Sequence, residues 1–285
     1  MDIIKPQQLP ILQESIKAQN LRIIAMTVCC MDVYPQRNEA YVGGNSINFA
    51  AQCVQKGISN TSVLGCIGTD DYGWEIIDIL TKSRINVSHL HTRSGKTASN
   101  RIYISEKGER FFLPDSWDGG VYQSFMLSEE DWAFVFEHDI VAIPANNPNF
   151  ASALDKLGDS KKLVVDFLDS RDYQAIENAL PKIALGFISG DQDMVTRLKP
   201  LSETIQTSII VTSGANGSIA LLGGKEFYQT AVPVETIVDT TGCGDSYQAA
   251  FTISWWKEHD ISRAMKEGAA AAAATLTHMG GIGNL

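Results

Sequence analysis

Short apolar runs alternate along this chain with segments of helical periodicity, and this alternation restricts the folds open to it. A run that is apolar at successive positions needs cover on both faces, as a strand in a parallel sheet has. Such runs lie at 21–31, 62–68, 139–143, 163–167, 184–189 and 208–213. Helical patterns lie at 46–57, 71–83, 128–137, 150–158, 172–180, 191–202, 244–259 and 261–279. The sequence therefore predicts an α/β fold with a central, mostly parallel sheet and helices on both faces.

Two extended segments interrupt this pattern. Residues 97–112 alternate polar and apolar side chains around Lys107-Gly108, which is typical of a β-hairpin, and residues 32–44 contain a turn at Pro35. We expect both segments to form a small β lid over a site within a fold that spans 21–285. Residues 1–20 are expected to be an N-terminal extension with a short helix at 9–19. The exposed edges of a sheet-like lid would allow a homodimer to form through it.

The charge balance restricts the partners of the chain. Its formal net charge is −10 and it has no basic run, which argues against binding to nucleic acid or to an anionic membrane. No apolar stretch reaches the roughly 18 residues that a membrane span needs, and the N-terminus lacks a signal-type apolar segment. The five cysteines have no metal-binding spacing, and an odd number suits a reducing compartment. These features predict a soluble, cytoplasmic protein.

The segment TTGCGDSY, which precedes the helical pattern at 244–259, has the composition of an anion site. Backbone N–H groups at a helix N-terminus lack intrahelical acceptors and attract negative charge. Glycine lets an anion approach the main chain closely, so the N–H groups of Gly242, Cys243 and Gly244 could hold an oxyanion or a phosphate. Asp245 follows in the first turn, where it could take a proton from an attacking hydroxyl. The same residues would also suit an ordinary helix cap.

Two further glycine-containing turns accompany the first. Gly43 and Gly44 precede a helical pattern that begins with Asn45 and includes Asn48, so close backbone approach and amide groups would be available to ligand hydroxyls. A strand also ends at Thr212 in a turn that contains Gly214 and Gly217. Each turn alone indicates only a helix cap or a chain reversal.

Together these three motifs resemble the ribokinase-like (PfkB) family of sugar and nucleoside kinases. Asp239-Thr240-Thr241-Gly242-Cys243-Gly244-Asp245 matches the family's Asp-Thr-x-Gly-Ala-Gly-Asp signature, and Gly43 to Asn48 match Gly-Gly-x-x-x-Asn. The runs MDVYP, GGNSINFA, GTDDYG, INVSHLHT and LSEEDW are similar to the fructoselysine 6-kinase branch. That branch phosphorylates the 6-hydroxyl of fructosamine-type sugar adducts.

The resemblance implies a kinase that uses ATP with Mg²⁺ and a β lid that closes on a sugar. It implies Asp245 as the catalytic base and the backbone of 242–244 as the anion hole. Asp32, Gly44 and Asn48 would hold sugar hydroxyls. Asn100 and Arg101 on the hairpin are candidates to reach a charged substrate tail. The nucleotide side would be lined by Thr212, Gly214 and Gly217, with Asp239 and Thr240 from the signature.

Three departures from the family pattern keep alternatives open. Cys243 replaces the usual alanine, and at a helix N-terminus its thiol could have a lowered pKa. Thr27-Val28 replaces a Gly-Asp pair that binds substrate in many members. Residues 189–192 replace an Asn-x-x-Glu segment near the metal, so the metal ligands are left unassigned. A nucleoside kinase, or a sugar-binding protein that has lost catalysis, would also fit. A Rossmann oxidoreductase fits poorly, because no Gly-x-Gly-x-x-Gly follows the first strand.

Two smaller groups are further candidates for site residues. Asp166 and Asp169 follow the strand at 163–167 and could compensate for the changed segment at 189–192, although solvated loop positions are favoured for both. His89 and His91 fall on one face of a short extended segment. No carboxylate or cysteine accompanies them at ligand spacing in the sequence, which favours a surface or packing role.

Overall fold

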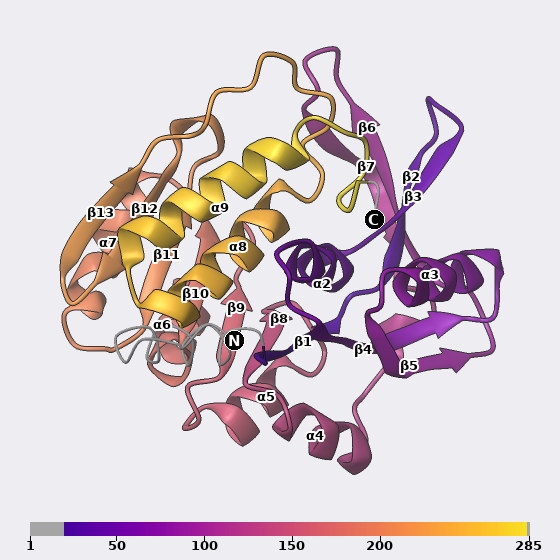
Figure 1. The fold of residues 1–285 in the computed structure, drawn as a ribbon, viewed down its shortest axis with the longest axis horizontal. Helices are drawn as coiled ribbons and strands as arrows, with labels where there is room; N and C mark the ends of the chain where they lie inside the picture. Colours follow the sequence, from indigo (N-terminus) through magenta and orange to yellow (C-terminus); the bar gives the residue numbers. More distant parts are fainter. Residues whose placement is uncertain (1–19, 284–285) are drawn as a thin grey trace, which may run out of the picture.

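Within residues 20–283, the part of the chain that this computed structural model describes, the strands form two sheets (Figure 1). The nine-stranded sheet has the order β13-β12-β11-β10-β9-β8-β1-β4-β5, and the four-stranded sheet has the order β3-β2-β6-β7. The large sheet contains β1 (Arg22–Thr27), β4 (Asn60–Gly68), β5 (Asn86–Arg93), β8 (Ile140–Pro144), β9 (Leu163–Asp166), β10 (Leu185–Ser189), β11 (Ser208–Thr212), β12 (Ser218–Leu222) and β13 (Lys225–Gln229). The small sheet contains β2 (Cys30–Tyr34), β3 (Glu39–Gly43), β6 (Ala98–Ile104) and β7 (Arg110–Asp118).

Helices cover both faces of the large sheet (Figure 1). They are α2 (Asn45–Gln55), α3 (Asp71–Lys82), α4 (Glu129–Phe136), α5 (Phe150–Leu157), α6 (Tyr173–Ala179), α7 (Gln192–Ser202), α8 (Cys243–Glu258) and α9 (Ile261–Thr275). One face packs against α2, α3, α8 and α9, and the other packs against α4 to α7. All strand pairs of the large sheet are parallel except those of β12 with β11 and β13. The predicted fold class is confirmed.

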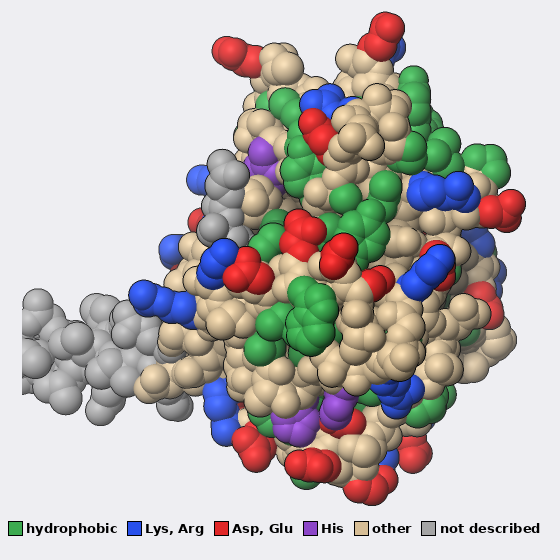
Figure 2. All heavy atoms as spheres, turned by 90° about the vertical axis from the view of Figure 1, so that its right-hand side faces the viewer, with side chains coloured by type: hydrophobic (Ala, Val, Ile, Leu, Met, Phe, Trp, Pro, Cys, Tyr) green, Lys and Arg blue, Asp and Glu red, His purple; other side chains and the backbone are tan. Residues whose placement is uncertain are grey.

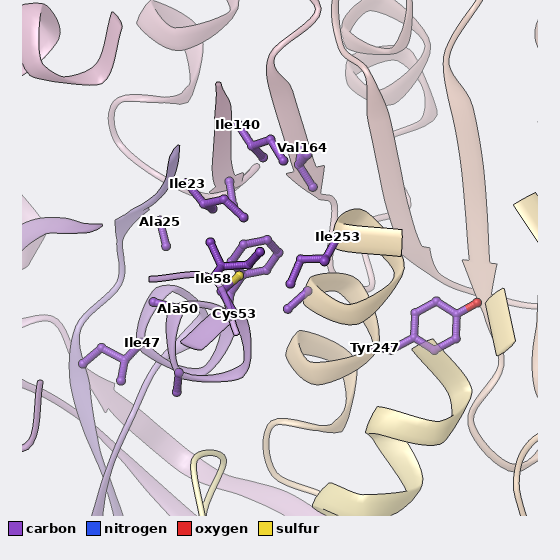
Figure 3. Packing of buried hydrophobic residues seen from close by; sticks show 14 of the residues in the cluster. Ile23, Ala25, Ile47, Ala50, Cys53, Ile58, Ile140, Val164, Tyr247 and Ile253 are labelled. Atoms are coloured by element: carbon purple, nitrogen blue, oxygen red, sulfur yellow. The ribbon is translucent and has the colours of Figure 1, made fainter. Parts of the chain in front are cut away.

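The core under α2 and α8 fixes how these two helices meet. Ile23 of β1 and Ile47, Ala50 and Cys53 of α2 are fully buried, and Ile253 of α8 packs into the same cluster (Figure 3). Burial of each large aliphatic side chain contributes about 1.5–3 kcal/mol, so this cluster holds the two helices firmly against the sheet. The N-termini of α2 and α8 are thereby brought together, as the contacts of their first side chains show below.

The chain leaves β1 in the middle of the sheet, where the strand order reverses. From β1 the later strands β4 and β5 lie on one side and β8 to β11 lie on the other. In open α/β sheets, ligands bind beyond the carboxyl ends of the strands at such a reversal. The four-stranded sheet follows β1 at this end, so it stands beside the expected ligand position (Figure 1).

This small sheet is formed by the two segments that the sequence indicated as a lid. The hairpin β6–β7 turns at Gly108, which has a φ of 79°, as the Lys107-Gly108 pair predicted. A Cβ at Gly108 would lie 2.5 Å from the carbonyl oxygen of Ile237. The N–H of Arg110 also donates to the hydroxyl of Thr240 at 2.9 Å. The tip of the lid therefore contacts the loop that leads into α8.

Three expectations about element bounds need comment. The run at 21–31 is not one strand: β1 ends at Thr27 and β2 begins at Cys30, because the chain passes there from the large sheet into the lid. The last helix ends at Thr275 rather than near 279. The helix expected at 9–19 lies outside the described residues. Across residues 20–283, no helix combines the length and apolar character that a bilayer crossing requires.

The helices differ in how their first turns are capped. Asp70, Ser128, Asp172, Asp191 and Asp260 cap α3, α4, α6, α7 and α9 through side-chain oxygens that accept first-turn N–H groups. In contrast, α2, α5 and α8 have no side-chain cap, and the N-cap residues of α2 and α8 are the glycines Gly44 and Gly242. The first-turn N–H groups of these two helices are thus left available at the place where the helices meet.

Candidate active site

The N-terminus of α8 presents unpaired backbone donors. Gly242 adopts a left-handed conformation with φ 77°, and a Cβ there would lie 2.5 Å from the Cα of Gly281, so this turn requires glycine. Among the described residues, no protein group accepts the N–H of Gly244 or Asp245, and Cys243 N makes only a 3.4 Å contact with Thr240 O. A Cβ at Gly244 would meet no atom within 4 Å. Open space therefore faces a helix terminus that favours anions.

Two amides from α2 hold the carboxylate of Asp245. Asn45 donates to Oδ1 at 2.7 Å and Asn48 donates to Oδ2 at 2.8 Å. Asn45 also donates to Oδ2 of Asp166 at 2.9 Å, so one amide group joins two carboxylates. Gly44 makes this approach of α2 possible, because its φ is 95° and a Cβ would lie 2.5 Å from Val28 O. The site thus combines the ends of β9, α2 and α8.

The electrostatics suit Asp245 to proton transfer near neutral pH. Burial, with the negative charge of Asp166 as the next contribution, raises the pKa of Asp245 to about 7, although the Asn48 hydrogen bond opposes this rise. Burial also raises the pKa of Asp166, against the effect of hydrogen bonds from Gln248 and Asn45. A general base is most effective when its pKa lies near the working pH.

The lid adds one acid and one cation. The Asp32 carboxylate on β2 lies over Gly43, where a Cβ would overlap it. Burial raises the pKa of Asp32 to about 7, opposed by the positive charge of Arg110 and assisted by Asp239. The Arg110 guanidinium stacks on Phe112 at 4.5 Å from the ring centre, and its charge also acts on Asp245. The lid can therefore place a positive charge near the two acids.

An open groove of about 570 Å³ lies between the loop that leads into α8 and the C-terminal half of α9. Its lining residues are Pro233, Val234, Glu235, Thr236, Val238, Ala273, Ala274 and Thr277. The groove has the size of a small-molecule site, and its loop wall runs directly into the uncapped start of α8.

Comparison with known proteins gives the family of this chain. The model of the pfkB family carbohydrate kinase matches residues 22–285. This chain belongs to the pfkB family of carbohydrate kinases. A "Fructoselysine 6-kinase" of Shigella flexneri is 34% identical over 259 residues, which cover 88% of this chain and 95% of that protein. The "Fructosamine kinase FrlD" of Bacillus subtilis (strain 168) is 24% identical over 269 residues, covering 92% and 93%.

A solved structure supports the pfkB fold independently. The nucleoside kinase of Methanocaldococcus jannaschii, an archaeal member of the ribokinase family, superposes with a TM-score of 0.74 at 21% identity and covers 93% of this chain and 94% of its own. The chain is accordingly an ATP-dependent sugar kinase, a phosphotransferase with an alcohol acceptor. The family membership excludes the Rossmann oxidoreductase, and the identities do not favour the nucleoside kinase alternative.

Three predicted nucleotide residues of this pfkB kinase do not line the groove itself, although Gly217 lies against Thr230 and Ala231, just before the first lining residue. Thr212, Gly214 and Gly217 lie at the end of β11 and in the following turn η4 (Gly214–Asn216), and none of them lines the groove. Asp239 is fully buried and accepts hydrogen bonds from Tyr34 at 2.7 Å, Thr241 N at 2.8 Å and Gly280 N at 2.9 Å. Asp239 therefore braces the turn before α8 from inside.

The predicted substrate residues on the lid also differ in placement. Arg101 is exposed and donates to Asp115 O at 2.7 Å. Asn100 pairs with Asp32 across the lid sheet, and its Oδ1 atom is buried without a partner among the described residues. Asn100 thus lies nearer the acids, whereas Arg101 bonds within the lid itself.

The prediction of a lowered Cys243 pKa is wrong. Burial, with the nearby charge of Asp239, raises the pKa of this thiol to about 12, and this rise outweighs the lowering that a helix N-terminus would cause.

The preference for a solvated Asp166 is also wrong, because its side chain is buried at the end of β9. Gln248 and Arg110, which also act on the carboxylates of the site, lie outside the sequence motifs. Gln248 lies three residues after Asp245 on α8, so the helical period places the two on one face. Arg110 and Phe112 are alternate residues of a strand and share one of its faces. These two patterns could have indicated Gln248 and Arg110 from the sequence.

The shared environment of Asp245 and Asp166 leads to a pH prediction. Asp245 must be deprotonated to act as a base, so kcat/KM should rise with pH with a midpoint near 7. The Asp166→Asn variant removes a negative charge beside Asp245, which should lower the Asp245 pKa and move the midpoint to lower pH. The pH dependence of kcat/KM measures this. The exposed Asp159→Asn variant should keep the wild-type midpoint, and an unmoved midpoint in Asp166→Asn would contradict the assignment.

Proposed function

We propose that this kinase transfers the γ-phosphoryl group of ATP to the 6-hydroxyl of fructoselysine or a related fructosamine. The 34% identity to a fructoselysine 6-kinase supports this acceptor. The observation that carries the proposal is the Asp245 carboxylate, which two amides hold beside unpaired N–H groups of α8. A base and an anion site lie there within one helical turn.

The chemistry follows from this arrangement. Asp245 takes the proton of the sugar 6-hydroxyl while the oxygen of that hydroxyl bonds to the γ-phosphorus. ADP leaves on the opposite side of the phosphorus. Negative charge on the phosphoryl oxygens is stabilised by the N–H groups of Gly242, Cys243 and Gly244. Asn45 and Asn48 keep the carboxylate aimed at the acceptor, since both hydrogen-bond to it. Closure of the lid would exclude water, which otherwise competes as acceptor.

ATP with Mg²⁺ completes the site. The groove beside α9 would hold the nucleoside part of ATP, so that its phosphates reach the start of α8. Mg²⁺ prefers carboxylate oxygens and phosphates, and Asp166 is the acid that shares Asn45 with Asp245. The residues present therefore fit a Mg²⁺ ion carried by ATP, which would neutralise phosphate charge. Thr212, Gly214, Gly217 and Thr240 remain proposed contacts on the nucleotide side.

The acceptor side is acidic, and this favours a cationic sugar adduct. A fructosamine carries an ammonium group beside the sugar ring, which the carboxylate of Asp32 on the lid would attract. Asn48 Oδ1 is buried without a partner among the described residues, so a sugar hydroxyl could donate to it. Gly44 is partly exposed beside it, whereas Gly43 is buried under the Asp32 carboxylate.

Two further features belong to the proposal. Tyr103 and Phe111 are 44% and 51% exposed on the lid, and hydrophobic side chains gather on this part of the surface (Figure 2). A homodimer through the lid would cover them.

The five cysteines are free thiols, which fits a reducing, cytoplasmic location.

An acceptor screen tests the proposed function. ADP release would be measured with fructoselysine, other fructosamines, fructose, ribose and nucleosides, and the phosphorylated position would be assigned by NMR. We expect the highest kcat/KM with a fructosamine and a 6-phosphate product. A nucleoside as the preferred acceptor, or a product phosphorylated at another hydroxyl, would contradict the proposal.

A further inference from the structure

A second group of potential ligands lies away from the active site, where β5 meets the N-terminus of α4. Nδ1 of His89 and Nε2 of His91 lie 2.9 and 2.7 Å from the same oxygen, Oδ1 of Asp131. Strand β5 is the outermost strand of the large sheet, and α4 covers the face opposite α2 and α8. Histidine side chains lie together on the lower part of the surface in Figure 2. This His–Asp–His cluster shares no residue with the site around Asp245.

The cluster has the ligand types and spacing of a zinc site. The two histidines occupy alternate positions of one strand, so both rings project from the same face. The three ligand atoms lie within 4.8 Å of one another. A tetrahedral zinc ion with ligands at about 2.0–2.1 Å requires neighbouring ligand atoms about 3.3 Å apart. The two nitrogen–oxygen separations of 2.9 and 2.7 Å are shorter than this by about half an ångström, and the two nitrogens, which lie within 4.8 Å of each other, would close by up to about 1.5 Å as the rings turn toward the ion.

Other contacts hold the three side chains in place. Oδ2 of Asp131 accepts hydrogen bonds from the N–H of Ser128 at 2.9 Å and from its hydroxyl at 2.8 Å, which leaves Oδ1 for the histidines. The His89 ring stacks on Phe134 at 4.0 Å with an interplanar angle of 8°. The His91 ring packs against Phe125 at 5.4 Å. Supporting contacts of this kind orient the ligands in metal sites.

Charge and access also suit a metal. Asp131 is 2% exposed, and its carboxylate oxygens lie within hydrogen-bond distance of His89, His91 and Ser128. A buried carboxylate between two imidazole rings attracts a cation. The side chain of His91 is 42% exposed, so an ion and a water ligand could enter from solvent. Two imidazoles and a carboxylate suit Zn²⁺ better than Mg²⁺ or Ca²⁺, which prefer oxygen ligands alone.

We propose that His89, His91 and Asp131 bind one zinc ion that ties the edge strand β5 to α4. On binding, the ring nitrogen of each histidine that faces Asp131 gives its lone pair to the ion, and the proton of the neutral ring then lies on the other ring nitrogen. Three protein ligands leave the fourth position for water. The ion would stabilise the sheet edge, and it would leave phosphoryl transfer unchanged.

Zinc titration of the chelator-treated, untagged full chain tests this proposal. Calorimetry should give one zinc per chain, with zinc also raising the melting temperature. Because even the loss of a group that only supports a ligand typically costs 10–100-fold in metal affinity, His91→Ala should weaken binding about 100-fold or more. His91 is partly exposed, so this variant should fold, which its melting temperature without zinc would check.

The matched control is His259→Asn. His259 is an exposed histidine at the end of α8 whose left-handed backbone conformation asparagine tolerates, so this variant should bind zinc as the wild type does. Equal zinc affinity in wild type and His91→Ala would overturn the proposal. Absence of stoichiometric zinc binding by the wild type would also overturn it.

Discussion

The Asp245→Asn variant should fold normally and lose most of its kinase activity. A positioned general base typically contributes 10²–10⁴-fold, so we expect kcat/KM for the sugar to fall by about that factor. The variant should fold because asparagine has the same shape and its carbonyl oxygen can accept from Asn45 or Asn48, which hold the carboxylate in the wild type. ADP release with the best acceptor of the screen measures the loss.

Binding measurements separate a lost base from a damaged site. Asp245→Asn should bind ATP and the sugar with near wild-type affinity, because ground-state binding does not require proton transfer. The Asp159→Asn substitution removes a charge at an exposed position and should leave kcat unchanged. Wild-type turnover in Asp245→Asn would show that another group takes the proton.

The Gly244→Val variant should lose activity because its side chain would fill the space intended for the transferred phosphoryl group. A Cβ at Gly244 meets no protein atom within 4 Å, so the valine has room in the free protein and the fold should be unaffected. The valine side chain would keep the phosphoryl group from reaching these N–H donors, and since loss of even one such donor typically costs 10²–10³-fold, we expect kcat to fall about 10²-fold or more. Steady-state kinetics with saturating ATP measures this.

A size series makes the interpretation specific. Gly244→Ala should lose less activity than Gly244→Val, since its side chain projects less far into the space. Gly242 would be a poor choice for this test, because a Cβ there collides with Gly281 and the backbone is left-handed, so its replacement would disturb the turn itself. Equal activity in wild type, alanine and valine variants would place the phosphoryl group elsewhere.

Much of the fold could be predicted from local pattern. The apolar runs and helical periods located the sheet and its helices, because each strand and helix must bury a face of its own. The run at 21–31 was misread, because an apolar stretch does not record that the chain changes sheets between Thr27 and Cys30. The lid hairpin was predicted correctly, since its alternation and its Gly108 turn are both local signals.

The candidate site was predictable where one motif contained the residues. Gly242 to Asp245 lie in one turn, and Asn45 and Asn48 lie on one helix face. Asp166 was misjudged because its burial depends on Asn45, which is 121 positions away in the chain. Asp131 was missed as a partner of His89 and His91 for the same reason: it comes from a separate helix and leaves no spacing signal.

The most direct test of the central claim is a crystal structure with ADP, aluminium fluoride and the preferred sugar. We predict that the fluoride group accepts hydrogen bonds from the N–H groups of Gly242 to Gly244, with the sugar 6-oxygen within hydrogen-bond distance of Asp245. An aluminium fluoride group bound away from the start of α8, or no sugar hydroxyl beside Asp245, would contradict this account.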